Sequence, residues 1–299
     1  MKIGVLMGGN SSERQVSLNS GKAIVDACKE LEYEVKEFDS KKDFDSLSRE
    51  IKKVDLVFNA LHGGDGENGV ISSKLDSLGV KYTGSDEKAS AICIDKDKSK
   101  KIVKKENYYT PDWVMLKKDD YKTPDISNLS FPLVVKPNSE GSTIGLSIIQ
   151  NESKLTEAIQ LARNYDENIL IESFIKGREI TVGIIGGESY PIVEIIPRHD
   201  LYDYECKYTK GMTDYICPAN IEEKNSKRIQ KIALKIHKLL ECRHYSRVDF
   251  RLDKNNKPWF LELNTHPGMT ETSLLPKSAA AAGFDFNSLI NKIIKQAFK

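Results

Sequence analysis

Residues 261–269 read Leu-Glu-Leu-Asn-Thr-His-Pro-Gly-Met, and residues 247–249 read Arg-Val-Asp. Apolar and polar side chains alternate through this part of the chain, which predicts two neighbouring strands that meet at a polar turn. The apolar residues expected on the buried face are Phe250, Leu252, Trp259, Leu261 and Leu263. This strand pair decides the fold, because it directs a set of polar side chains to one place.

The opposite face of the strand pair carries Asp249, Glu262 and Asn264. They offer hard oxygen ligands without sulfur, which suits Mg²⁺ when phosphate and water oxygens complete its coordination. The pattern therefore predicts a magnesium site beside a nucleotide phosphate. A solvated face of an ordinary antiparallel hairpin is the alternative interpretation.

The bulk composition indicates a globular protein of several lobes. A chain of 299 residues exceeds one typical core and suits two or three compact lobes. Its 39% hydrophobic and 30% charged residues are typical of soluble proteins, and its apolar runs are too short to cross a bilayer. A formal charge of +1 gives no reason to expect a nucleic acid or a membrane surface as partner.

The first residues and the cysteines favour a cytoplasmic protein. Residues 1–9 are expected to form a strand and not a secretory leader, because glycines interrupt the apolar run. Five cysteines are an odd number without a Cys-x-x-Cys pair, so neither a disulfide framework nor a zinc knuckle is expected.

Residues 1–86 are expected to form an N-terminal α/β lobe. Strand-like and helix-like segments alternate there, which is typical of a parallel sheet with helices on both faces. The predicted strands are 3–7 and 55–61, and the predicted helices are 18–31, 44–51 and 69–78. Ligands of such sheets gather at the carboxyl ends of the strands, where Gly8, Gly9 and His62 lie.

Two further lobes are expected, a central lobe over residues 87–175 and a C-terminal lobe over residues 176–299. The central lobe has predicted helices at 95–105, with its lysines outside, and 153–164, and predicted strands at 133–136 and 169–175. The C-terminal lobe has a predicted hairpin of 179–186 with 190–196, a helix at 219–241, the strand pair and two final helices. The polar loop 198–218 lacks periodicity and is predicted to be a lid.

A lysine and a loop of small residues form a second candidate site. Lys136 ends a buried strand, and the loop that follows contains Gly141, Ser142 and Thr143. Small residues expose backbone N–H groups that can hold phosphate oxygens, and the lysine adds a positive charge. The spacing does not match a P-loop, and a strand follows instead of a helix. A plain hairpin turn is the alternative interpretation.

The order of these motifs resembles the ATP-grasp superfamily and, over essentially the whole chain, the D-alanine:D-alanine ligase family. The matching segments are 8–9 with 12–17, 62–63 with 66–69, 95–96, 136–145, 202–205 with 207–208, and 264–276. The resemblance implies a fold of α/β and α+β type. In it, an N-terminal parallel-sheet lobe precedes two ATP-grasp lobes that hold ATP between them.

The resemblance also implies a reaction. ATP would phosphorylate the carboxylate of one D-alanine, and the amine of a second would attack the acylphosphate to give D-alanyl-D-alanine for peptidoglycan precursors. The implied cofactors are ATP and two Mg²⁺ ions, for which Mn²⁺ can substitute, and the implied assembly is a homodimer. Phosphoryl transfer rests mostly on positioning and charge neutralisation, which agrees with the lysines and oxygen ligands above.

The resemblance assigns nucleotide contacts residue by residue. The phosphates are expected to meet Lys96, Lys136 and, on the lid, Lys207. The adenine is expected to meet Glu172 and the backbone of Ser173 and Ile175, and the ribose Glu179. Phe174 packs either on the base or in the core.

The resemblance assigns the amino-acid sites in the same way. Asp249, Glu262 and Asn264 hold the two Mg²⁺ ions, with Glu262 as the bridge, and Arg247 and the Gly268 N–H stabilise the oxygen that becomes negative. Glu13 pairs with the first ammonium and forms a hydrogen-bonded triad with Ser142 and Tyr208, and His62 faces the first substrate. Ser273 and Leu274 meet the second carboxylate.

Several alternatives stay open in the sequence. Glu13 could simply cap a helix, and His62 could be a core histidine. The family has a histidine in place of Tyr208 when a hydroxy acid is the nucleophile, so an amine is expected here. Asn68 and His266 depart from the usual aspartate and serine. A D-alanine:D-serine ligase, another ATP-grasp amino-acid ligase, or a nucleotide-binding regulator without catalysis are the rival functions.

Overall fold

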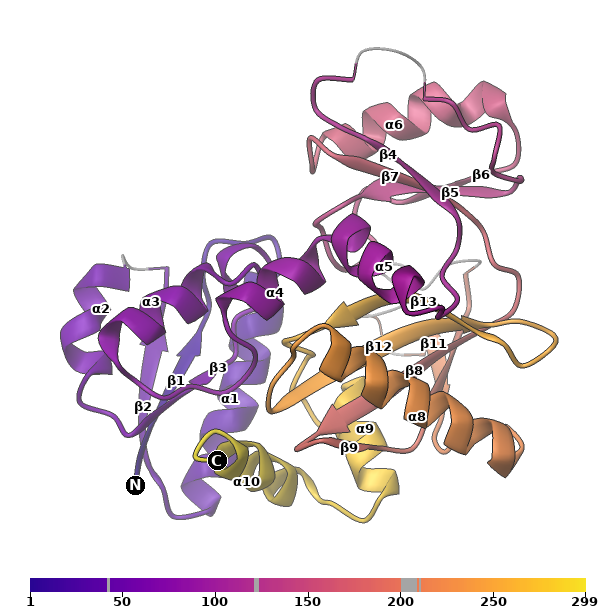
Figure 1. Ribbon diagram of the computed structural model, residues 1–299. Helices are drawn as coiled ribbons and strands as arrows, with labels where there is room; N and C mark the ends of the chain where they lie inside the picture. The colour runs from indigo at the N-terminus through magenta and orange to yellow at the C-terminus, as the bar shows by residue number, and fades with distance from the viewer. Residues whose placement is uncertain (42–43, 121–123, 200–208, 210) are drawn as a thin grey trace.

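The computed structural model describes residues 1–41, 44–120, 124–199, 209 and 211–299. Its strands form three sheets, which Figure 1 separates at the left, top and right of the molecule. The first sheet is parallel and has the order β2-β1-β3, from Glu34–Asp39, Lys2–Met7 and Leu56–Asn59. Helices α1, α2 and α3 accompany it, over Arg14–Glu30, Phe44–Ile51 and Val70–Leu78. The predicted parallel sheet is therefore confirmed.

Helix α1 forms because its buried residues recur every three or four positions. They are Ser17, Ser20, Gly21, Ile24, Val25, Ala27 and Cys28. Gly21 permits the close approach to β1, since a Cβ on this residue would lie 2.5 Å from Met7 Cβ. This packing brings the start of α1 to the carboxyl end of β1, where the sequence predicts ligands.

The second sheet is antiparallel and has the order β4-β7-β5-β6. Its strands are Trp113–Leu116, Ile169–Ser173, Leu133–Pro137 and Ser147–Ile149. Helix α6, Leu155–Arg163, covers it by burying Leu155, Ala158 and Ala162. Strands β5 and β7 are neighbours in this sheet, and they carry Lys136 and Glu172.

The third sheet is antiparallel and holds the predicted strand pair, in the order β11-β10-β8-β12-β13 with β9 beside β8. The strands are Thr213–Ile216, Val193–Pro197, Arg178–Ile185, Tyr245–Leu252, Pro258–Asn264 and, for β9, Glu188–Ser189. The remaining helices are α8, Glu223–Leu239, α9, Leu274–Ala281, and α10, Phe286–Gln296. Strand β11 lies within the loop that we expected to be without structure, and it pairs with β10.

A β-bulge in the strand pair corrects one part of the predicted burial. Asp249 faces Glu262 but Phe250 faces Phe260, so Leu261 is an extra residue. Phe260 and Leu263 are buried, whereas Trp259 and Leu261 turn to the other face. A strict alternation cannot reveal a bulge, since the extra residue shifts the pattern by one position.

Contacts between the sheets are made by helices α4, Glu87–Ile94, and α5, Lys96–Lys105. Cys93 and Val103 of these helices belong to the core of the third sheet, and α10 packs against α1 of the first. We propose three lobes that are divided near residues 86 and 175. In this division α4 and α5 belong to the central lobe by sequence, and they pack on the C-terminal lobe. Among the described residues, none of the helices has the length and apolar character to cross a bilayer.

Candidate functional site

Two adjoining cavities lie where the three sheets approach one another. The larger has a volume of about 610 Å³ and the smaller about 140 Å³. The residues that line both are Lys96, Glu140, Gly141, Ser142, Arg247, Glu262 and Leu274. The junction of the cavities therefore carries lysine, arginine and carboxylate groups together.

Every predicted site residue within the described part of the chain lines one of these cavities. The larger cavity has Glu13, His62, Lys96, Ser142, Arg247, Glu262, Asn264, Gly268, Ser273 and Leu274. The smaller has Lys96, Lys136, Ser142, Glu172, Ser173, Ile175, Glu179, Arg247, Asp249, Glu262 and Leu274. Lys207 and Tyr208 lie outside the described residues. Residues far apart in the sequence thus meet as expected, while their individual roles stay predictions.

The polar face of β12 and β13 is arranged as the sequence predicts. Arg247 faces Asn264 and Asp249 faces Glu262 across the two strands. Arg247 Nη2 donates to Asp249 Oδ2 at 2.8 Å, and Thr181 Oγ1 donates to Asp249 Oδ1 at 2.5 Å. This side of the sheet presents carboxylates that positive groups already hold in place.

The oxygen donors fit a hard divalent cation. Lys96 Nζ lies 3.2 Å from Glu262 Oε2, and the His266 N–H donates to Asn264 Oδ1 at 2.8 Å. Among the described residues, no group of three or more histidine, cysteine, aspartate or glutamate side chains could hold a metal. A metal at this face would therefore need the amide oxygen of Asn264 beside the carboxylates Asp249 and Glu262.

The loop after β5, which connects this strand to its antiparallel neighbour β6, lies beside Lys96 and has an unusual backbone. Lys96 Nζ donates to the Glu140 carbonyl at 2.7 Å, which ties the start of α5 to this loop. Ser142 and Thr143 have φ values of 52° and 63°, a left-handed conformation that is costly outside glycine. Strained backbone of this kind is concentrated at functional sites, which favours the loop over a plain hairpin turn.

A buried ion-pair cluster closes the end of the smaller cavity. Lys136 Nζ lies 2.6 Å from Glu172 Oε1, and Lys100 Nζ pairs with Glu172 Oε2. Burial acts to raise the pKa of Glu172, but Lys100 and Lys136 outweigh it and lower that pKa. The Glu172 carboxylate therefore favours its ionised form, in which both oxygens are hydrogen-bond acceptors.

Lys100 is a residue that the sequence analysis missed. We expected the lysines of residues 95–105 on the exterior, yet Lys100 is fully buried and burial lowers its pKa to about 8. The signal was present in the spacing, because Lys96, Lys100 and Val103 recur at helical intervals on the buried face of α5.

Glu13 and Ser142 join the first sheet to the loop that follows β5. Ser142 Oγ donates to Glu13 Oε1. Glu13 precedes α1, but its side chain makes no capping hydrogen bond there. The Glu13 carboxylate therefore does not cap the helix, although Ser11 Oγ of the same segment accepts from the Glu13 N–H at 3.2 Å. Two members of the predicted triad, Glu13 and Ser142, are in contact.

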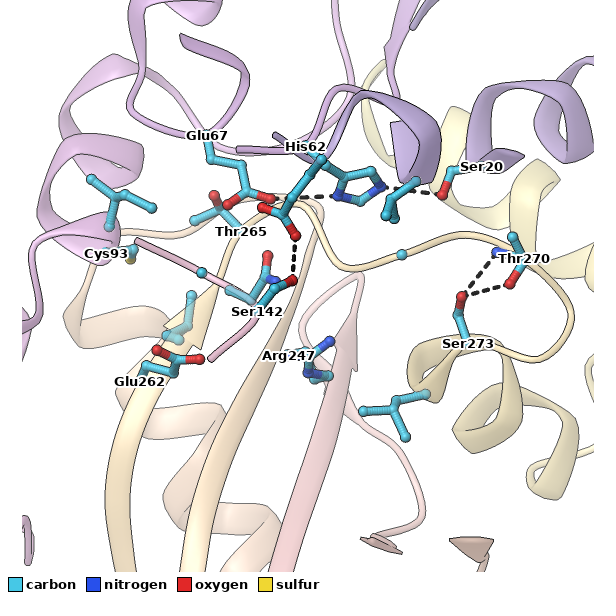
Figure 2. A pocket seen from close by; sticks show the side chains of 18 of the residues that line it. Ser20, His62, Glu67, Cys93, Ser142, Arg247, Glu262, Thr265, Thr270 and Ser273 are labelled. Carbon is cyan, nitrogen blue, oxygen red and sulfur yellow. Dashed lines mark hydrogen bonds and ion pairs between the residues drawn. The ribbon is translucent and has the colours of Figure 1, made fainter. Parts of the chain in front are cut away.

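His62 lies in a chain of hydrogen-bonding groups at the wall of the larger cavity (Figure 2). Its Nδ1 is 3.4 Å from Glu67 Oε1, and its Nε2 is 3.1 Å from Ser20 Oγ. Ser20 Oγ in turn accepts from the Met269 N–H at 3.2 Å. Burial acts to raise the pKa of Glu67, but the contact with His62 outweighs it and lowers that pKa. His62 is buried, has hydrogen-bonding partners and lines the cavity, and its contact with the first substrate stays a prediction.

The two departures from the family pattern lie behind the site. Asn68 accepts from the Val70 N–H at 3.0 Å and so shapes the start of α3. His266 is buried, its Nε2 is 3.0 Å from Asn59 Nδ2, and burial lowers its pKa to about 4. Because the amide donates, Nε2 of a neutral His266 is the acceptor. Both residues therefore support the cavity wall from outside.

The start of α9 completes the larger cavity. Ser273 Oγ accepts from the Thr270 N–H at 3.1 Å, and Figure 2 shows both side chains beside the cavity. Ser273 and Leu274 stand at the first positions of the helix. A helix start offers N–H groups and a partial positive charge, which suits a carboxylate.

Comparisons with known proteins agree with this geometry. A family model described as "D-ala D-ala ligase C-terminus" matches residues 102–295. The D-alanine–D-alanine ligase of Aquifex aeolicus is 48% identical to this chain, and the match covers 98% of this chain and 100% of the relative's own length. The D-alanine–D-alanine ligase of Pelotomaculum thermopropionicum is 42% identical to this chain, and the match covers 100% of this chain and 97% of the relative's own length.

Solved structures give the same result. The D-alanine–D-alanine ligase of Bacillus anthracis has a TM-score of 0.90 at 39% identity, with coverage of 100% of this chain and 97% of that one. A crystal structure of the same organism's ligase complexed with ATP has a TM-score of 0.88 at 37% identity, with the same coverage. The D-Ala:D-Ser ligase VanG of Enterococcus faecalis has a TM-score of 0.86 at 29% identity over 99% of both chains.

Proposed function

Because this chain belongs to the D-alanine–D-alanine ligase family, we propose that it joins two D-alanine molecules with the energy of ATP. The observation that carries the proposal is the junction of the two cavities at Lys96, Arg247 and Glu262. One cavity suits a nucleotide and the other suits amino acids. Their shared wall is where a phosphate could pass from one to the other.

The first step is phosphoryl transfer. The carboxylate of the first D-alanine attacks the γ-phosphorus of ATP, the bond to ADP breaks, and an acylphosphate forms. Lys96 and Lys136 neutralise phosphate charge, and Lys207 on the lid adds a further positive group. The strained loop around Ser142 offers backbone N–H groups to the same oxygens.

The second step is attack by an amine on the acylphosphate carbonyl. The carbonyl oxygen becomes negative, and Arg247 and the Gly268 N–H stabilise it before phosphate leaves. Glu13 pairs with the ammonium of the first D-alanine, and Glu13, Ser142 and Tyr208 form the triad around it. His62 faces the same molecule, and Ser273 with Leu274 bind the second carboxylate at the start of α9.

Mg²⁺ is the cofactor that the oxygen donors fit, with Asp249, Glu262 and Asn264 as its ligands and Mn²⁺ as a substitute. Bound there, two ions would supply positive charge to the phosphate oxygens. Lys96 lies beside Glu262 and Arg247 beside Asp249, so each of these carboxylates has a cation next to it.

Adenine and ribose are proposed to occupy the smaller cavity. Ionised Glu172 accepts from the adenine amino group, the backbone of Ser173 and Ile175 meets the ring edge, and Glu179 meets the ribose hydroxyls. The support is the position of these residues around one cavity with Phe174 between them in sequence.

D-serine as the second substrate is the alternative that a specific observation addresses. The curated relatives from 40% to 48% identity are named D-alanine–D-alanine ligases, while the D-Ala:D-Ser ligase is 29% identical. This difference favours D-alanine. A homodimer and a cytoplasmic location are proposals that rest on the family alone, and sedimentation analysis would test the first.

The test measures ADP and phosphate release with D-alanine, D-serine or D-lactate as acceptor, in Mg²⁺ and after chelation. We expect release with D-alanine, D-alanyl-D-alanine as the product, and loss of release on chelation. A dominant mixed product with D-serine would replace the proposal by the alternative. ATP that binds but is never turned over would identify a regulator instead.

A further inference from the structure

Arg251 is a residue of the smaller cavity that neither the sequence pattern nor the proposed chemistry assigns. It lies on β12, two positions after Asp249, and its side chain is 17% exposed. Its guanidinium group reaches away from the strand pair toward the segment that connects β7 to β8. That segment carries Ile175, which we propose for adenine, and the first residues of β8 after it carry Glu179, which we propose for the ribose.

The guanidinium group makes two polar contacts with this segment and one with the start of β8. Nε donates to the Ile175 carbonyl at 3.2 Å, and Nη2 donates to the Gly177 carbonyl at 2.6 Å. Nη1 donates to Glu179 Oε2 at 3.2 Å. A planar fork with donors in several directions can make these bonds at once, which a lysine cannot.

An aromatic contact adds to these bonds. The Arg251 guanidinium carbon lies 5.3 Å from the centre of the Phe174 ring, a distance at which a cation and a ring attract. Arg251 therefore touches four of the six residues from Phe174 to Glu179, by backbone, ring or carboxylate.

Both ends of the segment are tied to sheets, since the Phe174 N–H donates to the Pro132 carbonyl at 2.9 Å and β8 pairs with β12 from Arg178 onward. It links two sheets, and Gly177 has a φ of 155°, which side-chain-bearing residues rarely adopt. A connection of this kind between two sheets would move whenever the sheets move. Strand pairing already fixes the backbone of Glu179 in the third sheet, so what Arg251 sets is the position of Ile175 and the direction of the Glu179 carboxylate.

We propose that Arg251 is a positioning residue for the nucleotide, which sets the adenine-contacting backbone and directs Glu179 to the ribose. The inference rests on the proposed function, because it takes the smaller cavity as the ATP site. It predicts that Arg251 governs ATP affinity and the preference for ribose over deoxyribose. It also predicts that a change at Arg251 does not alter the affinity for D-alanine or the rate of the chemical step.

The experiment compares Arg251→Met, Arg251→Lys and the control Arg228→Met. Arg228 also donates to a backbone carbonyl, that of Asn256 at 2.6 Å in the turn between β12 and β13, but it lines neither cavity. The readouts are the KM for ATP, the KM for D-alanine, kcat, and the ratio of kcat/KM for ATP to that for 2′-deoxy-ATP. Circular dichroism and thermal unfolding check that each variant folds.

For Arg251→Met we expect the KM for ATP to rise roughly tenfold to hundredfold and the ATP preference over 2′-deoxy-ATP to fall toward one. Arg251→Lys should recover part of the preference, because a lysine can still reach Glu179, while Arg228→Met should match the wild type. A KM for ATP within twofold of wild type in both Arg251 variants would overturn the inference. So would an equal rise in the KM for D-alanine, which would indicate a general structural defect.

Equilibrium binding of ATP and 2′-deoxy-ATP without D-alanine separates this inference from the proposed function. If the wild type binds ATP and releases no ADP with any acceptor, the proposed function fails, and the binding ratio still tests Arg251. If the wild type turns over and Arg251→Met binds both nucleotides as the wild type does, only the inference fails.

Discussion

Lys100 Nζ and the Glu172 carboxylate form an ion pair in which neither side chain meets solvent to more than 3%. Lys136 holds the other oxygen of the same carboxylate, and Lys100 also lies 4.9 Å from the centre of the Trp113 ring. The pair joins helix α5 to strand β7 of the second sheet. A buried charge of this kind is tolerated only while its partner is present.

Replacement of Lys100 by methionine should therefore destabilise the protein strongly. It leaves Glu172 buried with one cation instead of two, and breaking a buried pair typically costs about 3–5 kcal/mol. Lys104→Met is the matched control, since its ion pair with Asp112 lies on the surface and is worth less than about 1 kcal/mol. Urea unfolding measures both variants, and similar losses in the two would contradict the buried role of Lys100.

Replacement of Arg247 by alanine should impair turnover more than ATP binding. If Arg247 stabilises the oxygen that becomes negative, its loss costs on the order of 3 kcal/mol, or about a hundredfold to a thousandfold in kcat. The Kd for ATP should change much less, because Lys96 and Lys136 remain. Rapid-quench kinetics and equilibrium binding provide the two numbers. A near-native kcat would rule out this role.

Acid should destabilise the protein between pH 6.5 and pH 4. Burial lowers the pKa of His237 and of His244 from 6.5 to about 4 in the folded state. The unfolded chain binds more protons than the folded one in this window, so the contribution of these histidines to the free energy of unfolding falls as pH falls and is lost below pH 4. The slope is at most about 1.4 kcal/mol per pH unit for each histidine, and less for the partly exposed His244.

His244→Asn isolates one share of this slope. His244 has a φ of 53°, which asparagine tolerates, and the amide oxygen can still accept from the Gly84 N–H. Urea unfolding at several pH values should give a shallower decline for the variant than for the wild type. An unchanged slope would mean that His244 does not contribute.

Much of the site could be predicted because its chemistry resides in short, ordered motifs. The strand pair places Asp249 and Glu262 opposite each other as alternation requires, and Lys136 ends its strand as expected. Local pattern carries such information, since side-chain direction has a period of two in a strand.

What the sequence missed depends on contacts between distant segments. The burial of Lys100 requires Glu172 from another element, and the role of Arg251 requires the connection of residues 174–179. The bulge at Leu261 also breaks the alternation that the prediction used. Charged side chains are ordinarily exposed, so single-residue expectations fail where two of them meet inside the protein.

Gly177, in the connection between β7 and β8, should tolerate a side chain poorly. A Cβ on Gly177 would lie 2.1 Å from the Leu252 carbonyl oxygen and 2.8 Å from its carbon, and backbone cannot yield cheaply. Gly187, in the turn after β8, also has a positive φ, of 80°, but nothing lies within 4 Å of its Cβ position.

Gly187→Ala should therefore cost only about 1–2 kcal/mol for the left-handed backbone. Gly177→Ala adds a clash to that strain and should cost more than about 3 kcal/mol, with a raised KM for ATP in whatever folds. Urea unfolding of both variants measures the difference, and equal stabilities would show that β12 and the connection can separate freely.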